Sequence, residues 1–341
     1  MEPLVRVENL VKHFSGGGGF LGGKATLVRA VDGVTFTVYK GETLGLVGES
    51  GSGKSTTGRL LLRLIEPTSG KAYFEDQELF GLSPAAMKPY RRRMQIVFQD
   101  PYGSLNPRMT VSNILREGLE PRGLARSEEE TEISRLLEIV GLRNTHRNRY
   151  PHEFSGGQRQ RIGIARALAV NPEFLIADEP VSALDVSIQA QVLNLLLELQ
   201  QKLGLTMLFI AHDLAVVRHM SDRIAVMYLG KIVELADSAQ IYSDPRHPYT
   251  RTLLSAIPIP DPEARHTVAP PELGAQTARL EGCVFRARCP FAQDRCAEEP
   301  ALRELATGQL VACHFAETLP AHGKDSPYVV TTDPVSLDPV P

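Results

Sequence analysis

The sequence predicts an α/β protein built on a largely parallel sheet. Short apolar runs alternate with segments whose apolar residues recur at helical spacing, and a glycine-rich turn joins one run directly to a helix. The 341 residues are 43% hydrophobic and 23% charged, which is ordinary for a chain that buries its own core in about two domains. We therefore expect a globular fold that needs no covalent support.

The N-terminal part predicts two strands and then a strand, loop and helix unit. Apolar strand patterns cover 4–14 and 28–40, and the glycine-rich "SGGGGFLGGK" between them is typical of a mobile loop. A third apolar run over 42–48 meets a glycine-rich turn. The leucines of the following segment, 55–65, recur at helical spacing and predict a helix.

The rest of the core continues this alternation. The region from about 101 to 170 is mostly helical, and Ser127 with the acidic residues after it indicates a helix N-terminus. Apolar segments predict strands over 172–178, 206–212 and 223–235. An amphipathic segment predicts a helix over 185–204, which ends at a glycine. After about residue 243 proline becomes frequent, which marks an appended region, and 326–341 predicts a disordered tail.

Charge and hydropathy narrow the classes of function. The net charge of −3 gives no basic footprint, so we expect no nucleic-acid partner. The first residues lack a basic segment followed by an apolar run, so we expect no secretory signal and a reducing, cytosolic environment. The longest apolar runs, such as "TMLFIA", fall far below the roughly 18 residues that cross a bilayer, so membrane association is expected to come through a partner.

"GESGSGKST", Gly48 to Thr56, fits the phosphate-loop pattern G-x-x-x-x-G-K-[ST] between a predicted strand and helix. Glycines let the backbone N–H groups turn toward phosphates, and the helix N-terminus adds partial positive charge. Lys54 is expected to reach the β and γ phosphates, and the Ser55 hydroxyl is expected to bind Mg²⁺. The alternative is a glycine-rich turn that matches by chance, but the strand and helix context argues against it.

Two further stretches gain meaning from this loop. "FLIADEP" ends an apolar strand at Asp178, suited to a metal, and Glu179, suited to orienting or deprotonating water. By itself, such a strand end is typical of any solvated turn. "FSGGQRQR" opens a helix with Ser155 and two glycines, which on these residues alone could contact an anion or simply cap the helix.

Six motifs in order over residues 48–212 resemble the nucleotide-binding subunit of an ATP-binding cassette (ABC) transporter. Besides the phosphate loop and "FLIADEP", these are "FQDP" with Gln99, "FSGGQ" with Phe154 where leucine is more usual, "SALD" ending at Asp185, and "IAHD" with His212. Phe14 falls where the family usually places an aromatic that stacks on adenine. The resemblance implies a P-loop NTPase (RecA-like) cassette over 1–242 with a helical subdomain at about 101–165.

The resemblance also implies an ATP site shared by two cassettes that face head to tail. The catalytic residues would be Glu179, His212 and Gln99, and the Mg²⁺ ligands Ser55, Gln99 and Asp178. The ATP-contacting residues, one set from each chain, would be Phe14, Gly48, Ser50, Gly51, Gly53, Lys54, Ser55, Thr56, Ser155, Gly156, Gly157, Gln158 and Asp185.

"HPYTRTLLSAIP", 247–258, resembles a C-terminal motif of the ABC subfamily that imports dipeptides and oligopeptides, and occasionally nickel. The resemblance reaches about residue 318 and is closer to the second cassette of such pairs. It implies an extension over 243–320 and a tail over 321–341. The implied partners are a second homologous ATPase subunit, two integral membrane permease subunits and an extracytoplasmic peptide-binding protein, with this chain at the cytoplasmic face of the inner membrane.

All four cysteines lie in the appended region. Cys283, Cys289, Cys296 and Cys313 are separated by five, six and sixteen residues, wider than the pairs typical of structural zinc, and four thiolates equally suit an iron–sulfur cluster. Spacing does not identify the metal, and buried free thiols are the alternative. The subfamily resemblance implies a [4Fe–4S] cluster, with zinc as the alternative and His314 as a bystander. A structural role is favoured over redox sensing.

Two other functions compete with peptide import. A soluble ABC ATPase of repair or translation usually has paired cassettes, a long coiled-coil insertion or basic surfaces, none of which this sequence shows. A redox-responsive regulatory module, in which ATP hydrolysis is secondary, would be favoured if metal removal abolished transport but left the ATPase intact.

Overall fold

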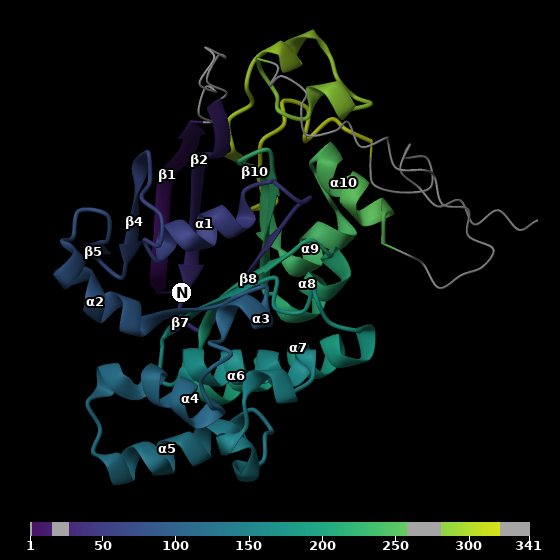
Figure 1. Cartoon of the computed structure of the whole chain (residues 1–341). Helices are drawn as coiled ribbons and strands as arrows, with labels where there is room; N and C mark the ends of the chain where they lie inside the picture. Colours follow the sequence, from purple (N-terminus) through teal and green to yellow (C-terminus); the bar gives the residue numbers. More distant parts are fainter. Residues whose placement is uncertain (1, 16–26, 258–280, 321–341) are drawn as a thin grey trace, which may run out of the picture.

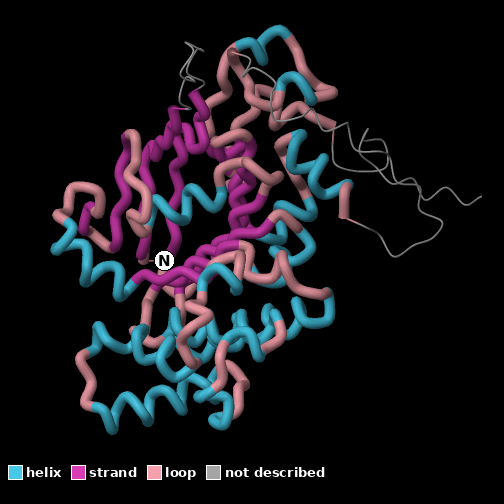
Figure 2. The backbone as a smooth tube through the Cα atoms, in the orientation of Figure 1, coloured by secondary structure: helices cyan, strands magenta, loops and turns pink. Residues whose placement is uncertain are grey.

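The computed structural model describes residues 2–15, 27–257 and 281–320. These residues form an antiparallel sheet, a larger central sheet and a group of helices on the far side of the central sheet (Figures 1 and 2). Residues 281–320, which together with α10 are called the C-terminal region below, lie beside α10. The glycine-rich loop and the tail expected from the sequence fall mainly outside the described residues.

The smaller sheet has the strand order β2-β1-β4-β5 and is antiparallel throughout. Its strands are β1 (Pro3–Ser15), β2 (Leu27–Tyr39), β4 (Ser69–Phe74) and β5 (Gln77–Glu78). Buried and exposed residues alternate along β2 because one face covers the core and the other meets solvent. The long β1–β2 hairpin confirms both strands expected in this region.

The central sheet has the order β11-β12-β10-β9-β3-β8-β7-β6. Its strands are β3 (Thr43–Val47), β6 (Met94–Val97), β7 (Phe174–Asp178), β8 (Thr206–Ala211), β9 (Arg223–Tyr228), β10 (Lys231–Asp237), β11 (Arg303–Glu304) and β12 (Leu310–Val311). The parallel part of the sheet consists of β9, β3, β8, β7 and β6. At the edge beyond β9, the strands β10, β12 and β11 pair antiparallel. Every residue of β3, β7 and β8 is buried, as expected for strands covered on both faces.

The described helices follow the expected α/β pattern. They are α1 (Lys54–Leu61), α2 (Pro84–Arg93), α3 (Pro101–Ser104), α4 (Val111–Leu119), α5 (Arg126–Ile139), α6 (Gly156–Leu168), α7 (Val186–Leu203), α8 (Leu214–Met220), α9 (Ser238–Ser243) and α10 (Pro248–Ser255). Short 3-10 turns lie at Glu120–Arg122, Asn144–Asn148, Pro151–Glu153, Arg286–Arg288 and Asp294–Ala297. Helices α4, α5 and α6 gather as one group (Figure 1) and pack against one another.

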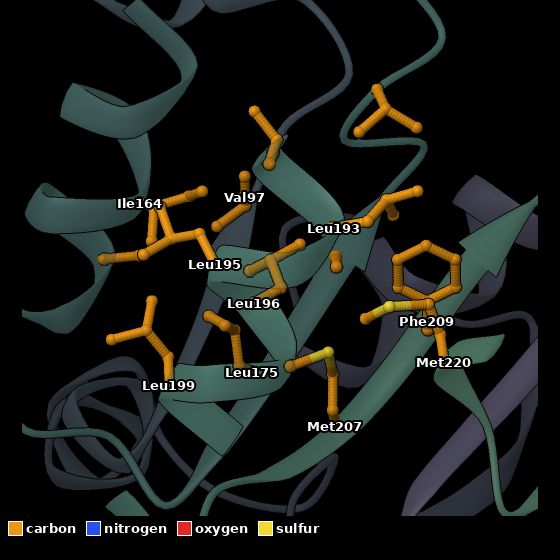
Figure 3. Packing of buried hydrophobic residues seen from close by; sticks show 14 of the residues in the cluster. Val97, Ile164, Leu175, Leu193, Leu195, Leu196, Leu199, Met207, Phe209 and Met220 are labelled. Carbon is orange, nitrogen blue, oxygen red and sulfur yellow. The ribbon is translucent and has the colours of Figure 1, made fainter. Parts of the chain in front are cut away.

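One hydrophobic core joins this helical group to the central sheet. Leu175 of β7 and Met207 and Phe209 of β8 face Leu196 and Leu199 of α7 (Figure 3), and all five side chains are at most 1% exposed. A second core fills the space between the smaller sheet, α1 and the other face of the central sheet. The strand ends that carry the candidate site are therefore fixed by packing on both sides.

Two expected helix boundaries are wrong. Helix α1 ends at Leu61 and not at 65, because Arg63 adopts a left-handed φ of 50° that stops the helix. Helix α5 begins at Arg126, and its first turn is closed by the Glu128 side chain, which accepts the Ala125 N–H at 2.8 Å, so Ser127 is not the cap. Within the described residues no helix has the length and apolar character needed to cross a membrane.

Candidate active site

The phosphate loop connects β3 to α1 and depends on glycine at its two ends. Gly48 has φ of 155°, and a Cβ there would lie 2.0 Å from the Met227 carbonyl oxygen. Gly53 has φ of 106°, and its Cβ would lie 2.1 Å from the Ala30 carbonyl oxygen. Only glycine fits where backbone approaches backbone this closely. Three other loop residues are expected to contact ATP. Ser50 and Gly51 are exposed, and Thr56 is half-buried.

Lys54 points back into this loop. Its ammonium donates hydrogen bonds to the carbonyl oxygens of Gly48 at 2.7 Å and Glu49 at 3.0 Å, and its Nζ lies 3.9 Å from Glu179 Oε1. The side chain is 3% exposed. Burial lowers the pKa of Lys54, although the nearby carboxylates act in the opposite direction. A buried cation in a loop of backbone donors is suited to an anionic ligand.

Ser55 and Asp178 form the second part of the site. The Ser55 hydroxyl donates to Asp178 Oδ1 at 2.6 Å, which joins the start of α1 to the end of β7. Asp178 is 1% exposed, and burial raises its pKa while the Ser55 hydrogen bond acts to lower it. A hydroxyl and a carboxylate in contact supply the oxygen ligands that Mg²⁺ prefers, so these residues fit that ion.

Glu179 brings three of the expected catalytic residues together. Its Oε2 accepts a hydrogen bond from Gln99 Nε2 at 2.9 Å and lies 3.5 Å from His212 Nδ1. Its own backbone has a left-handed φ of 46°, and its N–H donates to the Ile210 carbonyl oxygen at 2.9 Å. Strain of this kind in a non-glycine residue persists only where the surrounding structure holds it, and it concentrates at functional sites. Three motifs far apart in the sequence thus converge on one carboxylate.

The "FSGGQ" residues lie elsewhere, at the N-terminus of α6. Ser155 Oγ accepts the Gln158 N–H at 3.3 Å while Gln158 Oε1 accepts the Ser155 N–H at 3.2 Å, so the two form a capping box. Gly157 is buried against α7, where a Cβ would lie 2.2 Å from Ile188 Cγ2. Gly156 is half-buried. Within the described residues no hydrogen bond or ion pair joins these four residues to the Lys54 and Glu179 cluster.

Asp185 and Phe14 also stand apart from that cluster. Asp185 is the exposed N-cap residue of α7. Phe14, near the end of β1, is 41% exposed, and its ring centre lies 4.9 Å from Lys12 Nζ. One chain therefore assembles the phosphate and acidic residues in one place and leaves the other expected ATP contacts outside it.

The four cysteines line a single cavity. His247, Phe285, Phe291, His314 and Phe315 contribute to the same walls. Burial raises the pKa of the Cys289 thiol to about 12 and that of Cys313 to about 11, and the neighbouring cysteines add to both shifts. Across residues 2–15, 27–257 and 281–320, no group of three or more candidate ligands is arranged to hold a metal ion. The described residues therefore show neither a zinc site nor a cluster site, although four thiols around one cavity are the donor type that iron–sulfur clusters use.

The sequence did not indicate the polar network beneath α10. Glu234 is fully buried, and its carboxylate accepts the N–H groups of Arg246 at 2.7 Å and His247 at 2.9 Å. Arg251, also fully buried, donates to the carbonyl oxygens of Pro245 at 2.9 Å and Pro320 at 2.8 Å. The "HPYTR" stretch is therefore an anchored helix start. A glutamate within an apolar strand was the available signal, but alternation alone does not tell a buried carboxylate from an edge one.

Comparisons with known proteins agree with this geometry. Residues 31–182 match the family described as ABC transporter, and residues 233–296 match the one described as the C-terminal region of oligopeptide/dipeptide transporters. The chain is 53% identical over 320 residues to the putative oligopeptide transport ATP-binding protein YkfD of Bacillus subtilis, covering 92% of this chain and 95% of that one. It is 58% identical over 265 residues to the oligopeptide transport ATP-binding protein OppF of the same organism, covering 77% and 85%.

Solved structures show the same fold. The cbiO1 protein from Clostridium perfringens, described as part of an ABC transporter complex, aligns with a TM-score of 0.61 at 26% identity, covering 71% of this chain and 91% of that one. A dimeric ATP-binding cassette, MJ0796, described as a post-hydrolysis state bound to ADP and phosphate, aligns with a TM-score of 0.61 at 29% identity, covering 69% and 98%.

Proposed function

Because the chain belongs to the ABC transporter family and carries the C-terminal region of its oligopeptide and dipeptide transporters, we propose that it is the ATP-hydrolysing subunit of a peptide importer. The observation that carries this proposal is the convergence of the phosphate loop, Gln99 and His212 on Glu179. The C-terminal region supports the peptide class of cargo.

The chemistry of the site suits phosphoryl transfer to water. Backbone N–H groups of the phosphate loop and the Lys54 ammonium would bind the phosphates, and Ser55 and Asp178 would hold Mg²⁺. When bound, Mg²⁺ would supply positive charge beside the phosphate oxygens. Glu179 orients and deprotonates the attacking water, while Gln99 and His212 hold the Glu179 carboxylate in place. The protein forms no covalent bond in this reaction. The rate of hydrolysis therefore depends mainly on positioning of the reactants and on stabilisation of charge.

The remaining ATP contacts come from a second cassette. Ser155, with the N-terminus of α6 behind it, is exposed and away from its own phosphate loop, and the similar MJ0796 cassette is described as a dimer. A helix N-terminus suits an anion brought by a partner. We assign Ser155, Gly156, Gly157 and Gln158 to the partner's ATP, with Asp185 at the same interface and Phe14 at the adenine.

The other partners follow from peptide import. A second homologous ATPase subunit, two membrane permease subunits and an extracytoplasmic peptide-binding protein complete the transporter. Because the described residues include no membrane-crossing helix, attachment to the cytoplasmic face of the membrane would occur through the permease subunits. Co-purification with membrane proteins tests this arrangement. Association with ribosomes or DNA would instead favour a repair or translation ATPase.

We also propose that the cysteine cavity holds a [4Fe–4S] cluster on Cys283, Cys289, Cys296 and Cys313, with a structural role. The four thiols that line one cavity support this assignment, because cysteine thiolates are the usual ligands of such clusters. Metal analysis and absorption spectra of anaerobically purified protein test it. Iron with acid-labile sulfide is expected, and zinc or no metal would refute the cluster without touching the ATPase proposal.

The transport function itself is tested in cells that lack the chain. Uptake of labelled dipeptides and oligopeptides should return with the wild-type chain and not with Glu179→Gln. Restored uptake with the variant would contradict the role of Glu179. Unchanged uptake in cells without the chain would contradict the proposed cargo.

A further inference from the structure

Glu49, the second residue of the phosphate loop, is held by the C-terminal region. Its backbone N–H donates to the Tyr249 hydroxyl at 2.9 Å, and its carboxylate accepts two hydrogen bonds from the Arg288 guanidinium at 3.0 and 2.9 Å. Its carbonyl oxygen is the one that accepts from Lys54 at 3.0 Å. Glu49 therefore joins the ammonium that faces the phosphates to residues about 200 positions away in sequence.

Arg288 is built into this contact. Its side chain is 7% exposed, and its guanidinium lies 5.7 Å from the Phe285 ring centre and 5.8 Å from that of Tyr228. Burial alone would lower its pKa, but the contacts with Glu49 and Tyr228 together outweigh burial and the pKa is raised. Both hydrogen bonds come from the single nitrogen Nη1, and a charge-assisted contact of a largely buried arginine is screened less by solvent than an exposed pair.

Tyr249 is fixed equally well. It is fully buried in α10, with ring centres 4.5 Å from Tyr228 and 5.4 Å from Phe285. The start of α10 is held by the buried Glu234, so the tyrosine hydroxyl has a fixed place beside the loop. Phe285 also lines the cysteine cavity, which connects the walls of that cavity to the contact at Glu49.

The negative charge of Glu49 determines how the contact with Arg288 would affect nucleotide binding. A carboxylate one residue after Gly48 lies in a loop that binds anionic phosphates, so an unpaired negative charge there would oppose nucleotide binding. Arg288 neutralises it. The alternative is that the pair merely tethers the C-terminal region, as the ion pair between Lys231 and Glu299 does at β10. That pair does not touch the phosphate loop and therefore provides a matched control.

We propose that Arg288 and Tyr249 are positioning residues for the phosphate loop, through which the C-terminal region sets the affinity of the cassette for nucleotide. This inference rests on the proposed ATPase function. Neither residue needs to touch ATP, because both act through Glu49.

The first test compares Arg288→Ala with Glu299→Ala in the full chain. MgATP binding is measured by calorimetry, ATP turnover by phosphate release and integrity by thermal unfolding. Arg288→Ala should raise the Kd and KM for ATP about 5- to 20-fold, with turnover at saturating ATP within about 2-fold of wild type. Glu299→Ala should leave Kd unchanged. A Kd unchanged in Arg288→Ala, or raised equally in both variants, would overturn the proposal.

Three further variants keep the proposal testable if Arg288→Ala folds poorly. Arg288→Lys retains the charge and should weaken binding less than alanine does. Tyr249→Phe removes one hydroxyl and should raise the Kd about 2- to 5-fold. Glu49→Gln combined with Arg288→Ala removes both charges and should restore the Kd to within about 3-fold of wild type. Failure of that restoration would refute charge neutralisation. Absence of nucleotide binding in the wild-type chain would instead refute the proposed function.

Discussion

Glu234 is a buried carboxylate whose ionisation should make the protein less stable as the pH rises toward neutrality. It lies in β10 beneath α10, fully shielded from solvent. Burial raises its pKa from 4.5 to about 7, although the N–H groups of Arg246 and His247 and the charge of Arg251 act in the opposite direction. The perturbation that isolates this group is Glu234→Gln, which preserves the shape and cannot ionise.

The magnitude follows from the two pKa values. Between pH 4.5 and about 7 the folded state keeps a proton that the unfolded chain has released, so the free energy of unfolding falls as the pH rises. A difference of about 2.5 units at about 1.4 kcal/mol per unit gives about 3.5 kcal/mol, of which about 2.5 kcal/mol is lost between pH 5 and pH 8. The amide replaces one acceptor with a donor, which adds a constant offset independent of pH.

The assay is urea unfolding of both proteins from pH 5 to pH 8. His247, whose pKa is lowered to about 3 by burial, has the opposite pH dependence, but it is present in both proteins and cancels in their difference. Wild type should lose about 2.5 kcal/mol relative to Glu234→Gln over this range. Parallel curves would show that the carboxylate is not desolvated as the structure indicates, and would refute the reasoning.

The remaining predictions concern turnover, packing and metal. Glu179→Gln should slow ATP turnover by about 10²- to 10⁴-fold with ATP binding retained, and near-normal turnover would contradict its catalytic assignment. Gly157→Ala should cost about 1–3 kcal/mol in thermal unfolding, because its Cβ would lie 2.2 Å from Ile188 Cγ2. Gly163→Ala, in the same helix with open space around it, should be neutral or stabilising, and equal losses in both would argue against the clash. Cys296→Ser should lower iron per chain in anaerobically purified protein, and unchanged iron would exclude this thiol as a ligand.

The sequence by itself determined the local units. A phosphate loop needs glycines at fixed positions between a strand and a helix. The residues that meet this requirement are consecutive in the sequence, from Gly48 to Ser55, so the sequence alone identifies the loop. Apolar runs without polar alternation, as in β7 and β8, likewise predict strands covered on both faces. Boundaries were less predictable, because α1 ends at Leu61, just before a left-handed Arg63 that no propensity indicates.

Only the tertiary structure decided which residues far apart in the sequence contact one another. The convergence of Gln99 and His212 on Glu179 was expected only from family resemblance, since it depends on parallel strands bringing distant strand ends to one edge. The link from Arg288 to Glu49 spans 239 residues, and arginine and glutamate are too common for such a pair to be recognised in sequence. Long-range contacts of this kind arise from packing of whole elements, and only the folded chain defines them.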